Sequence, residues 1–143
     1  MTTRSSGILR RWRHLDAERR ALLVQAAIVL SGASAAVAVL PFDRAIRFGS
    51  ISRGCPRDLD AAKYVGAVET AAKYLPMRTM CIEKGLAAQR LLRRAGADAR
   101  LHYGARHHPQ TGKLEAHVWV SVDGINVIGG EEAADFAEVA TYA

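Results

Sequence analysis

Two side chains of this sequence could act together as a nucleophile and its base, Cys81 and His117. Cys81 begins a predicted helix, whose N-terminal dipole favours the thiolate, the nucleophilic form of cysteine. His117 begins a predicted strand against which that helix would pack, so its imidazole could take the thiol proton and later return it to a leaving amine. Each residue alone is more simply explained as structural, since free cysteines are often buried. The pair favours thiol-dependent hydrolysis.

A third group usually orients the imidazole and stabilises the imidazolium. Counting outward from a two-residue turn at Asp123-Gly124 places residues 129–131 opposite His117, and Glu131 is the acidic candidate there. Asp123 itself lies at the far end of the hairpin, roughly 20 Å along the strand from the histidine. We therefore expect Asp123 to be a turn residue and consider it a weaker catalytic candidate than Glu131.

The remaining cysteine and histidines carry weaker signals. Cys55 lies in a predicted loop with no base at a suggestive spacing, and we interpret it as structural or incidental. His102, His107 and His108 are interpreted as surface or loop residues. Because the histidine pair at 107–108 has no carboxylate or thiol ligand at a fixed spacing, we expect no metal site, and no cofactor.

Length and composition exclude several classes of protein. A chain of 143 residues makes one domain, and with 50% apolar and 24% charged residues it is not predominantly disordered. Aromatic residues make up only 6%, which argues against a stacking surface for single-stranded nucleic acid. Two cysteines are too few for a disulfide scaffold.

The positive charge is concentrated in the N-terminal part of the chain. Residues 1–57 hold ten arginines and three acidic residues, whereas residues 58–143 have a net charge of −1. The sequence thus predicts a basic helical region over 1–57 that packs on a core formed by 58–143 within one compact domain. Such a charge fits nucleic acid, an anionic membrane surface or an acidic protein. No nucleic-acid-binding module accompanies it, so no nucleic acid partner is expected.

Residues 21–40 form an uncharged stretch long enough to span a bilayer. Three interpretations compete: a helix buried in the same domain, a membrane span, and a cleaved signal. Alanines and several polar residues weaken the membrane span, and the 20 residues that precede the stretch are long for a signal peptide. We favour the buried helix and leave a possible membrane association open.

The periodicity changes from helical to alternating after Gly96. Helices are predicted over 8–20, 21–40, 60–75 and from Cys81 to Gly96, followed by strands over 99–104, 115–122 and 125–128. The small residue Gly85 lies on the inward stripe of the Cys81 helix and would allow close approach to the sheet. Helices followed by a meander predict an α+β fold with a small antiparallel sheet.

Two segments resemble one known family. The run CIEKGLAAQRLLRRAGADARL at 81–101 and the run AHVWVSVDG at 116–124 are similar to the transglutaminase-like cysteine proteases of lasso peptide biosynthesis. The N-terminal part is similar too, with Trp12-x-x-Leu15, a long apolar helix and Leu40-Pro41-Phe42. The resemblance covers nearly the whole chain.

The resemblance implies a papain-like, transglutaminase-type core that removes the leader from a ribosomally made lasso peptide precursor before macrolactam closure. Cys81 would be the nucleophile and His117 the general base and acid. It also implies a cytoplasmic location and three partners: the precursor peptide, a quinoprotein-chaperone-like leader-recognition protein and an asparagine synthetase-like lasso cyclase. Family cleavage usually follows a leader whose penultimate residue is threonine.

The sequence departs from the family at the third catalytic position. Members with a full triad carry an aspartate near position 129, where this chain has Ile128-Gly129-Gly130. Glu131 or a backbone carbonyl could orient His117, a dyad could suffice, or the chain could be inactive. Two other functions therefore stay open: a catalytically impaired scaffold that holds precursor and cyclase, and an exported peptidase that uses residues 21–40 as its targeting segment.

Overall fold

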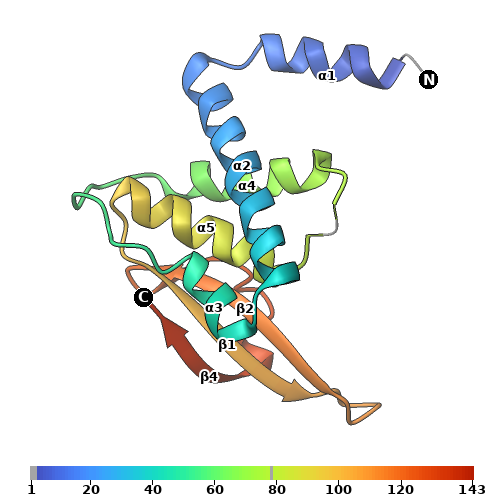
Figure 1. The fold of residues 1–143 in the computed structure, drawn as a ribbon, viewed down its shortest axis with the longest axis vertical. Helices are drawn as coiled ribbons and strands as arrows, with labels where there is room; N and C mark the ends of the chain where they lie inside the picture. The colour runs from blue at the N-terminus through green and yellow to red at the C-terminus, as the bar shows by residue number, and fades with distance from the viewer. Residues whose placement is uncertain (1–2, 78) are drawn as a thin grey trace.

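The fold begins with helices and ends with a sheet, in the order that the sequence predicted (Figure 1). The computed structural model describes residues 3–77 and 79–143. Within them the helices are α1 (Thr3–Arg13), α2 (Ala17–Val39), α3 (Phe42–Ala45), α4 (Ala61–Tyr74) and α5 (Cys81–Ala95), and the strands are β1 (Ala99–His107), β2 (Leu114–Val122), β3 (Ile125–Ile128) and β4 (Ala137–Tyr142). Short 3-10 turns occupy Ile46–Phe48 and Ala133–Asp135. The α+β class, with a papain-like arrangement of helices and antiparallel sheet, is confirmed.

The sheet has the order β3-β2-β1-β4, with every neighbouring pair antiparallel. The predicted turn between β2 and β3 is present, because Asp123 and Gly124 both have positive φ, 51° and 80°. Asp123 is therefore a turn residue. The strand β4 was not predicted; it pairs with β1 and is joined to α5 by a hydrogen bond of 2.8 Å from Gln89 Nε2 to the carbonyl of Tyr142.

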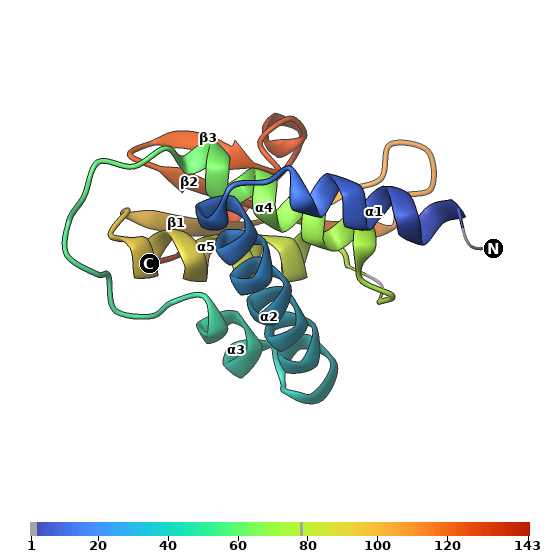
Figure 2. The same cartoon turned by 90° about the horizontal axis from the view of Figure 1, so that it is seen from above.

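Helix α5 packs directly on the sheet, and α2 and α4 pack on α5 (Figures 1 and 2). Close packing of α5 depends on Gly85, where an added Cβ would lie only 2.8 Å from Val118 Cγ1 of β2. The helix ends at Gly96 in the left-handed conformation, φ 107°, as expected for a glycine that follows a helix. The predicted role of Gly85 in helix–sheet approach is confirmed.

The long apolar helix starts earlier than predicted. Asp16 caps α2, because its carboxylate accepts the Arg19 N–H at 2.8 Å, so the helix expected over 8–20 is divided into α1 and the first turn of α2. One stripe of α2 is buried against α4 and α5, including Leu30 and Ala33, whereas Ile28 on the opposite side is 67% exposed.

Among the described residues, α2 is the one helix long and apolar enough to cross a membrane, judged by length and composition only. Core helices of soluble proteins and signal sequences can have the same properties. The choice between a helix that packs only within this domain and one that also meets a membrane therefore stays a prediction.

Candidate active site

Cys81 occupies the first turn of α5, where the sequence placed it. Its free thiol is half-buried and packs beside the main hydrophobic core. The helix start is held by Glu83, whose buried carboxylate accepts the Met80 N–H at 3.0 Å. Met80, at the N-cap position, makes no capping hydrogen bond with its side chain. Glu83, the third residue of the helix, caps this end instead. This arrangement holds the cysteine beside the N–H groups at the positive end of the helix.

His117 is nine-tenths buried near the start of β2, and its ring makes one hydrogen bond in the described part of the chain. Its Nε2 lies 2.7 Å from the carbonyl oxygen of Gly129. A carbonyl only accepts, so in the neutral ring Nε2 carries the hydrogen and Nδ1 keeps its lone pair. The ring also packs on Trp119 and Phe136, with centroids 6.0 Å and 5.2 Å away. Nδ1 is therefore the atom that can accept a proton.

Gly129 can reach the histidine because the chain turns sharply after β3. Its φ is +71°, and an added Cβ would lie 2.7 Å from the Val118 carbonyl oxygen, so a side chain here would be both strained and crowded. An aspartate side chain, which the family carries near this position, does not fit this turn as it stands.

Glu131, the acidic candidate, does not orient the ring. It is exposed and makes no hydrogen bond to His117 in the part of the chain that the structure describes; the contact expected of it is made by the Gly129 carbonyl. The end of β3 and the turn at Gly129 explain the difference, because the chain leaves the strand before Glu131 can pair opposite His117. A shift between Val120 and Ser121 pairs Val120 with Ile128 instead of its simply counted partner, and the strand then ends.

The surroundings of His117 form a hollow of about 620 Å³ at the edge of the sheet. Because β3 ends at Ile128, the hollow opens beside β2 and is lined on its far side by Val65 and Glu69 of α4. Glu69 in turn pairs with Lys84 of α5 at 3.2 Å, one turn beyond the helix start. The lining of the hollow includes no residue of α5, so the Glu69–Lys84 pair is its link to the helix that carries Cys81.

The structure brings the elements of Cys81 and His117 together without bonding the two side chains. Val118, the neighbour of His117, faces Gly85 of α5, while alternation along β2 turns His117 toward Trp119 and Phe136. No hydrogen bond joins the Cys81 thiol to the imidazole among the described residues. His117 shares the face of Trp119, opposite the face of the sheet on which α5 packs. The catalytic pair is therefore still a prediction, and its formation requires the His117 ring to turn around the open edge of β2.

The outer face of the sheet holds a histidine network that the sequence did not suggest. His102 was expected on the surface, yet its ring stacks on Trp119 at 5.5 Å and its Nε2 lies 2.7 Å from Ser121 Oγ. Its Nδ1 lies 3.2 Å from a carboxylate oxygen of Glu138 in β4. Spacing along β1 and β2 could have suggested the pairing of His102 with Trp119, but Glu138 could not be placed without β4.

The other candidates lie apart from the hollow. His108 Nδ1 accepts N–H groups of its own loop, from Gln110 and Thr111, and His107 bonds to the Gly112 carbonyl. No group of three or more potential metal ligands occurs among the residues described. Cys55 is exposed in a loop.

Comparison with known proteins places the chain in one family. Residues 26–141 match the model of the transglutaminase-like superfamily, a span that includes Cys81, His117 and most of α2. No curated protein gives a significant match, and no solved structure does. Because the match covers most of the chain and the whole of the site, this protein belongs to the transglutaminase-like superfamily, which includes cysteine peptidases.

Proposed function

We propose that this protein is a cysteine peptidase that removes the leader from a ribosomally made lasso peptide precursor before macrolactam closure. The observation that carries the proposal is the hydrogen bond from His117 Nε2 to the Gly129 carbonyl, which leaves Nδ1 as the proton acceptor. Support comes from the superfamily match and from Cys81 at the N-terminus of the helix that packs beside the histidine's strand. The lasso peptide substrate rests on the resemblance of residues 81–101 and 116–124 to that family.

The reaction passes a proton through His117 twice, once to form the thioester and once to hydrolyse it. His117 Nδ1 takes the Cys81 proton, and the thiolate adds to the scissile carbonyl carbon. The C–N bond breaks as the imidazolium returns the proton to the departing core amine, which leaves the leader as a thioester on Cys81. His117 then takes a proton from a water molecule, whose oxygen adds to the thioester carbon. The C–S bond breaks, the leader leaves as its carboxylate, and the imidazolium returns the proton to the Cys81 sulfur. The carbonyl of Gly129 holds Nε2 in the resting structure, and it can stabilise the imidazolium only if the ring keeps or remakes this bond after turning toward Cys81.

The same resemblance supports the proposed partners and place of action. We propose that the enzyme works in the cytoplasm on a precursor presented by a quinoprotein-chaperone-like recognition protein. The freed amine then passes to an asparagine synthetase-like cyclase. Fractionation of cells tests the location, since recovery in the envelope with a trimmed N-terminus would favour the exported alternative, which the length and composition of α2 motivate.

The direct test is leader release. Precursor is incubated with this protein and its recognition partner, and the products are identified by mass spectrometry. We expect leader and core peptides with the native chain and with Cys55→Ser, and only intact precursor with Cys81→Ala or His117→Gln. Cys55→Ser is the matched control, because that thiol is exposed in a remote loop.

A second candidate function is a scaffold that binds precursor and cyclase without cutting. It is favoured by one observation, the glycine at position 129 where family members with a full triad carry an aspartate nearby. Formation of the complex with no leader release by the native chain would support the scaffold and contradict the peptidase.

A further inference from the structure

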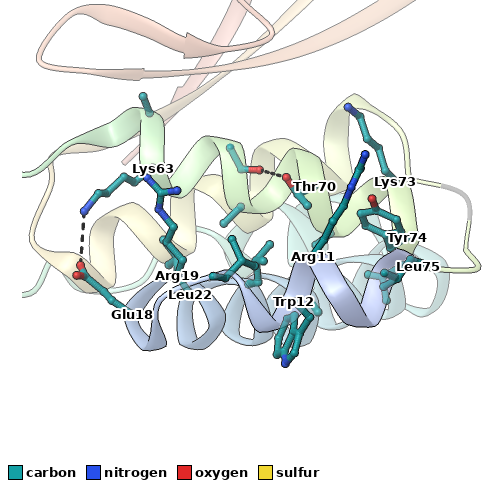
Figure 3. A pocket seen from close by; sticks show the side chains of 18 residues that line it. Arg11, Trp12, Glu18, Arg19, Leu22, Lys63, Thr70, Lys73, Tyr74 and Leu75 are labelled. Atoms are coloured by element: carbon teal, nitrogen blue, oxygen red, sulfur yellow. Dashed lines mark hydrogen bonds and ion pairs between the residues drawn. The ribbon is translucent and has the colours of Figure 1, made fainter. Parts of the chain in front are cut away.

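A groove of about 730 Å³ runs between α1, α2 and α4 (Figure 3). It shares no lining residue with the hollow at His117, although α4 lines both. Leu22, Leu23 and Ala27 of α2 form one wall, and Ala67 and Ala71 of α4 belong to its floor. This volume lies within the range of roughly 300–1,000 Å³ typical of ligand sites. The groove is a continuous apolar surface beyond the buried core.

The floor is open because one of its residues lacks a side chain. A Cβ built on Gly66, in the middle of α4, meets no heavy atom within 4 Å. Glycine in the interior of a helix costs about 0.5–1 kcal/mol relative to alanine. No neighbouring atom requires the glycine, so the open space above it is available to a side chain from another molecule.

Positive charge marks both ends of the groove. Arg19 and Lys63 lie toward one end with Glu18, and Arg11 and Lys73 lie toward the other (Figure 3). The basic groups at the first end are paired with carboxylates, Lys63 with Glu18 at 3.6 Å and Arg19 with Asp16 at 3.9 Å. By contrast, no carboxylate among the described residues lies within ion-pair distance of Arg11 or Lys73. The lining therefore has an excess of basic groups at its rim and an apolar centre.

We propose that this groove docks a peptide segment of a partner protein, one with large apolar side chains in its middle and carboxylates toward its ends. The lining of α4 from Ala62 to Tyr74 corresponds to about 18 Å of helix, enough for a helical segment of about twelve residues. Helices recognised in this way place apolar anchors on one face. The inference depends on the groove alone and holds whether or not Cys81 is catalytic.

The test uses a defined probe with the full-length protein. The probe is a fluorescein-labelled synthetic peptide of 14 residues, with leucine at helically spaced positions and glutamate at both ends. A second peptide has lysine in place of each glutamate. We expect fluorescence anisotropy to show micromolar binding of the acidic peptide and binding at least tenfold weaker for the basic one, with affinity falling as salt rises.

Two pairs of variants locate the binding. Gly66→Leu fills the groove and should weaken binding at least tenfold, whereas Ala35→Leu on an exposed part of α2 outside the groove should not. Arg11→Glu with Lys73→Glu should weaken binding about tenfold, whereas Lys113→Glu in the exposed β1–β2 loop should change it less than twofold. Circular dichroism and thermal melting confirm that each variant is folded.

Three results would overturn the proposal. The first is no binding of the acidic peptide at 100 μM, or binding that Gly66→Leu leaves unchanged. The second is a concentration-dependent dimer, detected by light scattering, that Gly66→Leu dissociates, since the occupant would then be a second copy. The third is co-sedimentation with phosphatidylglycerol vesicles that Gly66→Leu abolishes, since the groove would then meet lipid. Leader cleavage is not measured, so failure here is separate from failure of the proposed function.

Discussion

The imidazole of His117 is oriented by a main-chain carbonyl where a carboxylate was expected. A peptide carbonyl carries a partial negative charge, so it fixes the ring tautomer but stabilises the imidazolium less than an ionised aspartate would. Triad hydrolases that lose the correct tautomer slow by about 10⁴-fold. The hydrogen bond to Gly129 preserves the tautomer. Because the tautomer is kept but the imidazolium is less stabilised, we expect leader release to be slower than in an enzyme with a full triad.

Substitution at two neighbouring positions separates the carbonyl from the carboxylate. Gly129→Ala should slow leader release by at least tenfold, because its φ of +71° and the close Val118 carbonyl force the chain, and with it the acceptor, to move. Glu131→Gln should change the rate less than twofold, because Glu131 does not bond to His117. Single-turnover rates measured by mass spectrometry test this, with melting curves to verify folding. An equal loss in Glu131→Gln would restore the carboxylate to the mechanism.

The two thiols should differ in reactivity. Cys81 lies beside the free N–H groups of a helix N-terminus, whereas Cys55 lies in an exposed loop. With iodoacetamide at pH 6, we expect Cys81 to be labelled several times faster than Cys55 even though it is less exposed. Peptide mass spectrometry over a time course measures both rates, and labelling in urea gives the reference for the unfolded chain. Equal rates in the folded protein would argue against an activated thiolate.

At the scale of elements, two helical glycines have opposite roles. Gly66→Ala should raise the free energy of unfolding by about 0.5–1 kcal/mol, because the site is open and alanine is the better helix former. Gly85→Ala should lower it by up to about 2 kcal/mol, because the added methyl lies 2.8 Å from Val118 Cγ1 and overpacking exceeds the gain in helix propensity. Urea denaturation measures both changes. A stabilised Gly85→Ala would mean that α5 can move off β2 without cost.

Local signals predicted most of these elements, and long-range pairing accounts for the errors. The Cys81 helix, its end at Gly96 and the Asp123-Gly124 turn depend on neighbouring residues, and all three are confirmed. The register shift in β3 and the pairing of β4 with β1 depend on contacts across the sheet, which no spacing in the sequence encodes. From the sequence, a backbone carbonyl was one of two groups that could orient His117, the other being Glu131. Choosing between them required the position at which β3 ends and the chain turns.

At the scale of the whole molecule, the basic N-terminal segment lies outside the core. Among the hydrophobic residues that the structure describes, none before Leu22 belongs to the core or packs against it, and the superfamily match begins at residue 26. The charge asymmetry in the sequence predicted a distinct basic region, but it could not show that α2 packs on both α4 and α5. The boundary predicted at residue 57 therefore stays a prediction.

Removal of α1 tests whether this helix contributes to the stability of the core. A chain that begins at Asp16 after its initiator methionine keeps the α2 cap and should melt within about 4 °C of the full chain, because it loses no core residue. It should bind the acidic peptide more weakly, since Arg11 and Trp12 are gone from the groove. Differential scanning calorimetry and anisotropy measure the two effects. A large loss of stability would show that α1 belongs to the folding unit.

The Gly129 carbonyl has a consequence for how such enzymes are recognised. A main-chain oxygen cannot be identified as a hydrogen-bond acceptor from its residue type, so the contact with His117 depends on the path of the backbone, which here requires a glycine. A search of sequences for an acidic residue near position 129 would wrongly classify this chain as lacking any group to orient His117. Whether a related chain can orient its histidine therefore has to be judged from the direction of the main-chain carbonyl in the turn after β3.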